Sequence, residues 1–179
     1  CYDVATAMRT PFISGKDSLN NEFSYQDQEG DRQTISIPST LLISALGQVD
    51  DVATCVSMDL KAAGNLVYQV GQTHDELGGS HLGLVSGANG GRVPRMDPGI
   101  ALPTFKAIHQ GICQGLIRSC HDLSEGGLAV AAAEMAFAGG LGLRLDVAGL
   151  SEQVGEVAAL FAESNSRFLC EVTTDNAAA

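Results

Sequence analysis

The sequence contains no tryptophan and is poor in aromatic and basic residues. Aromatic residues make up 5% of its 179 positions, and 10 Lys and Arg residues stand against 21 Asp and Glu residues, for a formal charge of −11. Proteins hold nucleic acids with clusters of Lys and Arg, and they stack unpaired bases on aromatic rings. The composition therefore argues against a nucleic-acid-binding protein. Any phosphate ligand must be held locally, by backbone amides, by one or two cations or by bound Mg²⁺.

The sequence also lacks long apolar runs and paired cysteines. No run approaches the roughly 20 apolar residues that cross a bilayer, and the N-terminus has no signal-peptide pattern. With 45% hydrophobic residues, we expect a globular protein of the cytoplasm without membrane contact. Because the sequence has no CxxC pair, it suggests neither a disulfide framework nor a zinc site. We expect reduced core thiols at positions 1, 55, 113, 120 and 170.

Strand and helix patterns alternate along the chain, and both ends fall in helical patterns that predict a piece of a longer polypeptide. A polar segment at 24–33 predicts an exposed loop. The glycine-bearing stretch 58–65 marks a junction between subdomains 1–62 and 63–179. This alternation predicts an α+β fold, an α/β sandwich. Expected strands are 11–14, 34–37, 40–49, 66–70, 118–123, 141–147 and 167–172, and expected helices are 1–10, 103–118, 128–138 and 152–161.

The segment HDLSEGG, residues 121–127, precedes the alanine-rich helical stretch. Ser124 stands where an N-cap residue belongs, and Gly126 and Gly127 open the first turn without side chains. Bare N–H groups and the positive end of the helix dipole suit a phosphate, with His121 and Asp122 available for hydrogen bonds. Glu125 would repel a phosphate unless a cation lay between them. The alternative is an ordinary capped helix whose glycines permit tight packing.

The segment GKDS, residues 15–18, follows an apolar run and combines groups suited to a phosphate and a metal. Gly15 permits close backbone approach, and Lys16 offers a positive charge. Asp17 is a hard oxygen ligand for Mg²⁺, and Ser18 can donate to a phosphoryl oxygen. The segment is not a Walker A loop, because the upstream glycine is missing and Asp17 separates Lys16 from Ser18. The alternative is a polar turn that leaves a strand.

Five segments of the chain are distinctive when taken together: PFISGKDSLNNEF, IPSTLLISALGQVDD, GNLVYQVGQTHDELGGS, HDLSEGGLAVAAAEMAFAGG and FAESNSRFLCEV. In this order they resemble the phosphoribosylformylglycinamidine synthase family, and the likeness covers essentially the whole chain. The resemblance implies that residues 1–62 end an N-terminal barrel subdomain of the aminoimidazole-ribonucleotide-synthetase type. Residues 63–179 would then form the C-terminal α/β sandwich, and 40–51 a barrel strand. Without its barrel partners that strand would expose an apolar edge, so we expect self-association.

The resemblance also implies a reaction. The family uses ATP and Mg²⁺ to activate the amide oxygen of formylglycinamide ribonucleotide (FGAR), and ammonia from a glutaminase domain or subunit then gives the amidine. By motif position, Gly15, Lys16 and Ser18 would contact nucleotide or substrate, and Asp17 would bind Mg²⁺. A phosphate-side role would fall to His121, Asp122, Ser124, Gly126 and Gly127. The chain would need the remainder of the synthetase for turnover.

Two other interpretations stay open. The chain could be a non-catalytic nucleotide-binding or assembly module, in which the two motifs hold a permanently bound ADP that stabilises the fold. It could also belong to a selenophosphate synthetase or a hydrogenase-maturation relative of the same superfamily. Those proteins carry a glycine-rich ATP loop near their N-terminus.

Overall fold

The computed structural model describes residues 1–16, 21–38 and 40–178. The chain divides into two compact units, Cys1–Asp50 and Asp51–Ala179. The first unit contains helix α1 (Tyr2–Met8) and strands β1 (Glu22–Gln26) and β2 (Arg32–Ser36). The second unit contains the remaining elements in chain order, which are η1 (Val52–Thr54), β3 (Leu66–Val70), α2 (His81–Ser86), α3 (Pro98–Cys113), β4 (Ile117–Asp122), α4 (Gly127–Gly139), α5 (Ala148–Val154), α6 (Glu156–Phe161), β5 (Phe168–Val172) and η2 (Thr174–Asn176).

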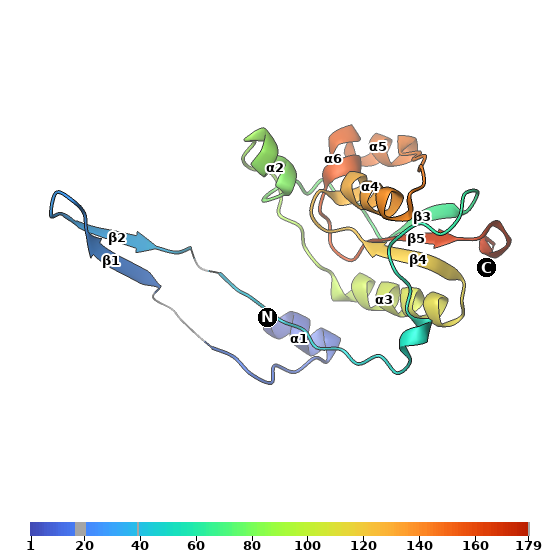
Figure 1. The fold of residues 1–179 in the computed structure, drawn as a ribbon, viewed down its shortest axis with the longest axis horizontal. Coiled ribbons are helices and arrows are strands. Elements are labelled where there is room, and N and C mark those ends of the chain that lie inside the picture. The colour runs from blue at the N-terminus through green and yellow to red at the C-terminus, as the bar shows by residue number, and fades with distance from the viewer. Residues whose placement is uncertain (17–20, 39, 179) are drawn as a thin grey trace. The chain divides into compact units, whose positions relative to one another are not determined.

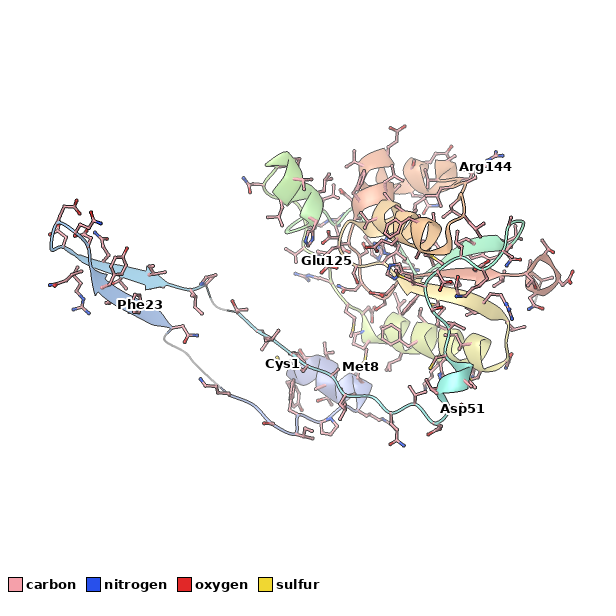
Figure 2. All side chains as sticks on the ribbon, viewed as in Figure 1. Cys1, Met8, Phe23, Asp51, Glu125 and Arg144 are labelled. Atoms are coloured by element: carbon pink, nitrogen blue, oxygen red, sulfur yellow. The ribbon has the colours of Figure 1, made fainter. Side chains whose placement is uncertain are left out.

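Strands β1 and β2 form an antiparallel hairpin in the first unit, with Glu22 opposite Ser36 (Figure 1). The carboxylate of Asp27 organises the turn by accepting from the backbone N–H groups of Glu29 and Asp31. On β1, Phe23, labelled in Figure 2, stacks on the ring of Tyr25. The prediction of an exposed loop over 24–33 is therefore wrong about secondary structure, because its β-compatible residues pair with each other.

The strands predicted at 11–14 and 40–49 are wrong in this structure. Both segments lack regular secondary structure, and their apolar side chains are exposed, with Ile13 at 88% and Leu46 at 95%. A strand needs a neighbour that takes up its backbone hydrogen bonds, and an apolar pattern specifies burial without specifying that neighbour. The strand predicted at 34–37 is confirmed by β2, and the barrel and the self-association stay predictions.

The second unit is built on a three-stranded antiparallel sheet in the order β3-β5-β4. Helix α3 lies on one face of this sheet, and α4, α5 and α6 lie on the other (Figure 1). Side chains alternate along the central strand β5, so Leu169 packs toward α4 while Cys170 packs with Ile108 of α3. The mixed helix-and-sheet architecture confirms the predicted α+β class.

Three predicted elements of the second unit differ from the structure. Helix α3 begins at Pro98, capped by Asp97, and contains Pro103 where the prediction began. The predicted helix 152–161 is two helices, because Gly155, with φ 85° and ψ 154°, breaks the helical path. The predicted strand 141–147 is irregular, although Leu141, Leu143 and Val147 pack on the α4 side of the core. The alternation of apolar residues in this segment therefore reflects burial of one side of the chain and does not reflect pairing with a strand.

The cysteine prediction is partly confirmed. All five thiols are free, and Cys170 is buried while Cys120 is half-buried. Cys1, Cys55 and Cys113 are exposed, so the expectation that they are core thiols is wrong.

Glu171 of β5 ties three segments of the second unit together. Its carboxylate is 1% exposed and accepts from the backbone N–H groups of Lys61 and Ala62, from the amide of Asn65 and from the hydroxyl of Ser119. Burial raises the pKa of this carboxyl, but the four hydrogen bonds outweigh burial and hold it below its ordinary value. The ionised side chain therefore joins the chain before β3 to both β4 and β5.

We predict that Glu171→Gln lowers the free energy of unfolding by about 2–4 kcal/mol at neutral pH. The amide keeps the size of the side chain but loses the charge and sets an N–H₂ group against backbone and side-chain donors. Urea unfolding measures the change. Glu152→Gln, at an exposed position of α5, is the matched control and should alter stability by less than about 0.5 kcal/mol.

The same pair tests ionisation. Because the pKa of Glu171 is lower in the folded chain than in the unfolded one, its stabilisation is complete above the ordinary value of 4.5 and is lost as pH falls through the folded value. The stability difference between wild type and Glu171→Gln should thus shrink in acid. A difference that is constant with pH would contradict a buried carboxylate.

Candidate functional site

A cleft of about 360 Å³ lies where β4 leads into α4. It is formed by the end of β4, the following loop, the turn before β5 and one aromatic side chain of α3. Glu125, labelled in Figure 2, belongs to the loop between β4 and α4. The lining residues are Phe105, Asp122, Leu123, Ser124, Glu125, Glu163, Asn165, Ser166 and Phe168.

The carboxylate of Glu163 caps the start of two helices. Its Oε1 accepts from the backbone N–H of Gly126, before α4, and from that of His81, the first residue of α2, each at 2.8 Å. The ring nitrogen Nδ1 of His81 lies 3.6 Å from the same oxygen. Carboxylates are stabilised at helix N-termini by the unpaired N–H groups and the helix dipole. One protein carboxylate thus takes the amide at which the sequence predicts a phosphate.

The prediction that Ser124 caps α4 is wrong. The N-cap residue is Gly126, with φ 78°, and no side chain caps the helix from that position. The hydroxyl of Ser124 donates to Asp122 instead, and its carbonyl accepts from the N–H of Gly127. Gly126 and Gly127 both have positive φ, and the N-cap lies at Gly126, two residues after the predicted N-cap Ser124. A serine N-cap pattern does not anticipate this shift.

His121 lies between two carboxylates at the end of β4. Its Nε2 lies 2.8 Å from Oε2 of Glu134 on α4, and its Nδ1 lies 3.4 Å from Oδ1 of Asp122. The hydrogen bond from Ser124 lowers the pKa of Asp122, and His121 lowers it further. His121, Asp122 and Ser124, which the sequence predicts to share a site, therefore form one hydrogen-bonded group.

Buried Arg167 fixes the turn that carries Glu163. The guanidinium is 1% exposed and donates to the carbonyl oxygens of Ser164 and Ala162 and to the hydroxyl of Thr73. Burial lowers the pKa of Arg167 to about 10, while the charges of Glu76 and Glu163 favour the protonated form. The side chain is therefore charged at neutral pH, and it holds both sides of Glu163 in place.

Gly126 and Gly127 are in close contact with their neighbours. A Cβ on Gly126 would lie 2.2 Å from a methyl group of Val130. A Cβ on Gly127 would lie 2.4 Å from the carbonyl oxygen of Ala162 and 3.0 Å from that of Leu160. Helix α4 thus approaches the backbone of α6 where only a glycine fits, which supports the packing interpretation. The predicted phosphate-side role of both glycines stays a prediction.

The GKDS motif belongs to the first unit. Gly15 and Lys16 lie in an exposed segment without regular secondary structure, and Asp17 and Ser18 lie outside the described residues. The convergence of the two motifs on one ligand therefore stays a prediction. Within 1–16, 21–38 and 40–178, no group of three or more His, Cys, Asp or Glu residues is arranged to hold a metal ion.

Residues 62–179 match the family model of the AIR synthase related protein, C-terminal domain. The chain belongs to this family. Its sequence is also 36% identical over 175 residues to the phosphoribosylformylglycinamidine synthase subunit PurL of Alkaliphilus metalliredigens. That match covers 97% of this chain and 22% of the relative, so the chain spans about a fifth of the curated protein.

Solved structures support the same fold. PurL of Thermotoga maritima complexed with FGAR superposes with a TM-score of 0.56 at 17% identity, over 71% of this chain and 23% of that one. T. maritima PurL complexed with ATP gives 0.50 at 16% identity, over 82% and 21%. None of the helices in the described residues is long and apolar enough to cross a membrane.

Sequence reasoning missed Glu163, Glu134 and Arg167 as parts of this site in the AIR synthase related domain. Glu163 stands 37 residues after the amide that it caps, and Arg167 stands 94 residues after Thr73. The local signal was a turn-forming ESNS segment before a strand, and it carries no information about a partner elsewhere in the chain. The side chain of Glu134 is 39% exposed beside His121.

We predict that Gly127→Ala destabilises the protein by about 2–4 kcal/mol, because the methyl group meets backbone atoms and φ of 63° disfavours alanine. Thermal or urea unfolding measures the change. Gly142→Ala is the matched control, since no heavy atom lies within 4 Å of its Cβ position, and its stability should change by less than about 0.5 kcal/mol or rise slightly. Equal stability of the two variants would refute the close contact.

Proposed function

We propose that this chain is part of the synthetase that converts FGAR, ATP and ammonia into formylglycinamidine ribonucleotide, ADP and phosphate. The observation that carries the proposal is the 36% identity to a PurL subunit across 97% of the chain. A match of that extent includes both GKDS and HDLSEGG. Because the chain spans only 22% of that relative, the remainder of the synthetase is a required partner, and a glutaminase domain or subunit would supply the ammonia.

The chemistry of the cleft supports Mg²⁺–ATP as the cofactor. Asp122, Glu125 and Glu163 line the cleft, and carboxylate oxygens are the protein ligands that Mg²⁺ prefers. Mg²⁺ is commonly held by one or two carboxylates together with substrate phosphates, so a site does not require three protein ligands. In the proposed assignment Asp17 binds the metal and Gly15, Lys16 and Ser18 contact nucleotide or substrate.

The group at the end of β4 would then act by positioning. His121 is held between Glu134 and Asp122, and Ser124 is held by Asp122. Activation of an amide by a phosphoryl group depends chiefly on orientation and on neutralising charge. Fixed side chains around an acidic cleft can supply the orientation, while the bound Mg²⁺ supplies the charge.

A chimeric synthetase tests the proposal. The matching segment of the A. metalliredigens PurL subunit is replaced by this chain, and ADP formation is measured with FGAR, Mg²⁺–ATP and ammonium chloride in place of glutamine. We expect FGAR-dependent turnover within about tenfold of the parent subunit, which corresponds to about 1.4 kcal/mol in the barrier.

The outcome also separates the proposal from a non-catalytic module. A chimera that folds like the parent, by its melting curve and its size in solution, and yet forms no ADP would refute a catalytic contribution. If such a chimera retained ADP that does not exchange with added nucleotide, the structural nucleotide-binding alternative would be supported instead.

The metal assignment has its own test in the active chimera. We predict that Asp17→Asn lowers Mg²⁺-dependent turnover at least about tenfold and raises the Mg²⁺ concentration needed for half-maximal rate, because a ligand charge is lost. Asp31→Asn, in the exposed hairpin turn, is the matched control and should leave both quantities unchanged. Unaltered kinetics in Asp17→Asn would remove Asp17 from the metal site.

A further inference from the structure

Two cysteines face each other across the sheet of the second unit. Cys120 of β4 is directly opposite Cys170 of β5, and their Sγ atoms lie 3.8 Å apart although 50 residues separate them in the chain. Opposed residues of antiparallel strands have Cα atoms about 4.5–5.5 Å apart. Disulfides form across Cα distances of about 4.4–6.8 Å. The Cα separation typical of opposed residues therefore lies within the range in which disulfides form.

The two thiols differ in accessibility. Cys170 is 3% exposed within a cluster that includes Ile108 and Ile117, whereas Cys120 is half-buried at the margin of the same cluster. Cys120 is therefore the more accessible of the two residues. The hydrogen bond between the thiols also lowers the pKa of Cys120 and raises that of Cys170. The greater accessibility of Cys120 and its lowered pKa make it the attacking thiol, and Cys170, its partner across the sheet, the resolving one.

We propose that Cys120 and Cys170 form an oxidisable dithiol, which a low-molecular-mass disulfide such as oxidised glutathione converts into a cross-strand disulfide. The thiolate of Cys120 attacks one sulfur of glutathione disulfide, and the glutathione S–S bond breaks as a mixed disulfide forms. The thiolate of Cys170 then attacks Sγ of Cys120 and releases the second glutathione. Two protein thiols lose two electrons and two protons, and one glutathione disulfide becomes two glutathione thiols.

The bond would act on the site through the strand. Residue 120 immediately precedes His121, and β4 is held on its other side by the hydrogen bond from the N–H of Cys120 to the carbonyl of Ser57. A covalent link to the central strand would fix the last residues of β4 against β5. The inference is independent of the proposed function, because it depends on the strand register, the sulfur distance and the difference in burial between the two cysteines.

The test incubates the purified chain with oxidised glutathione, blocks remaining thiols with N-ethylmaleimide and maps non-reduced peptides by mass spectrometry. We expect a peptide pair linked through Cys120 and Cys170, and alkylation of the three exposed cysteines. Cys113→Ser is the matched control, because it removes an exposed thiol that lies outside the proposed pair. The linked pair should form equally well in this variant.

Two further variants keep the proposal open to refutation. Cys120→Ser should leave Cys170 unmodified, and Cys170→Ala should halt the reaction with glutathione attached to Cys120. Circular dichroism establishes whether each variant is folded. If Cys170→Ala, which replaces a buried residue, does not fold, Cys120→Ser alone still tests the proposal. Glutathione found only on Cys1, Cys55 or Cys113 of the wild type, or a link between two chains instead of within one, would overturn the inference.

Discussion

The second unit depends on two charged side chains that are buried at opposite ends of its central strand. Arg167 stands just before β5 and Glu171 lies near its end, each 1% exposed. A buried charge is costly unless hydrogen bonds satisfy it, and each of the two groups has at least one partner far away in the sequence. Arg167 gathers Thr73, Ser164 and Ala162, while Glu171 gathers 61–65 and Ser119. The central strand thereby fixes the loops at both ends of the sheet.

The geometry of the cleft depends on Arg167, one of these two buried charges. Arg167 bonds the carbonyl oxygens on both sides of Glu163, so the carboxylate of Glu163 is presented to the amides of Gly126 and His81. Close approach of Gly127 to the carbonyl of Ala162 joins α4 to the same turn. The start of α4, the start of α2 and the turn before β5 are thus coupled through a few polar contacts. A ligand that moved the carboxylate of Glu163 would therefore disturb the hydrogen bonds at the starts of both α2 and α4.

Local sequence patterns predicted the strands of the sheet correctly. They failed where the structure of a segment depends on a partner far away in the sequence. Strands β3, β4 and β5 and helix α4 lie where apolar spacing and glycine punctuation place them. The segment 40–49 carries an equally good strand pattern, yet it remains irregular because a strand requires a partner. At the site, the HDLSEGG residues were found together, but the cap was assigned to Ser124. The group that caps α4 is the carboxylate of Glu163, which accepts from the N–H of Gly126 and is identified only by tertiary contact.

The charge of the cleft constrains what it can bind. Three of its lining residues are acidic, and among the described lining residues none is Lys or Arg. A second negative charge about 4 Å from a carboxylate costs between about 1 kcal/mol in water and about 4 kcal/mol near a protein surface. A bare phosphate would meet this repulsion and would also find the Gly126 amide already bonded to Glu163. A divalent cation placed between the carboxylates and the phosphate would replace this repulsion with attraction, and the hydrogen bond between Glu163 and the Gly126 amide could stay in place. The electrostatics of the cleft therefore oppose a free phosphate, and a divalent cation bound beside the phosphate would relieve that repulsion.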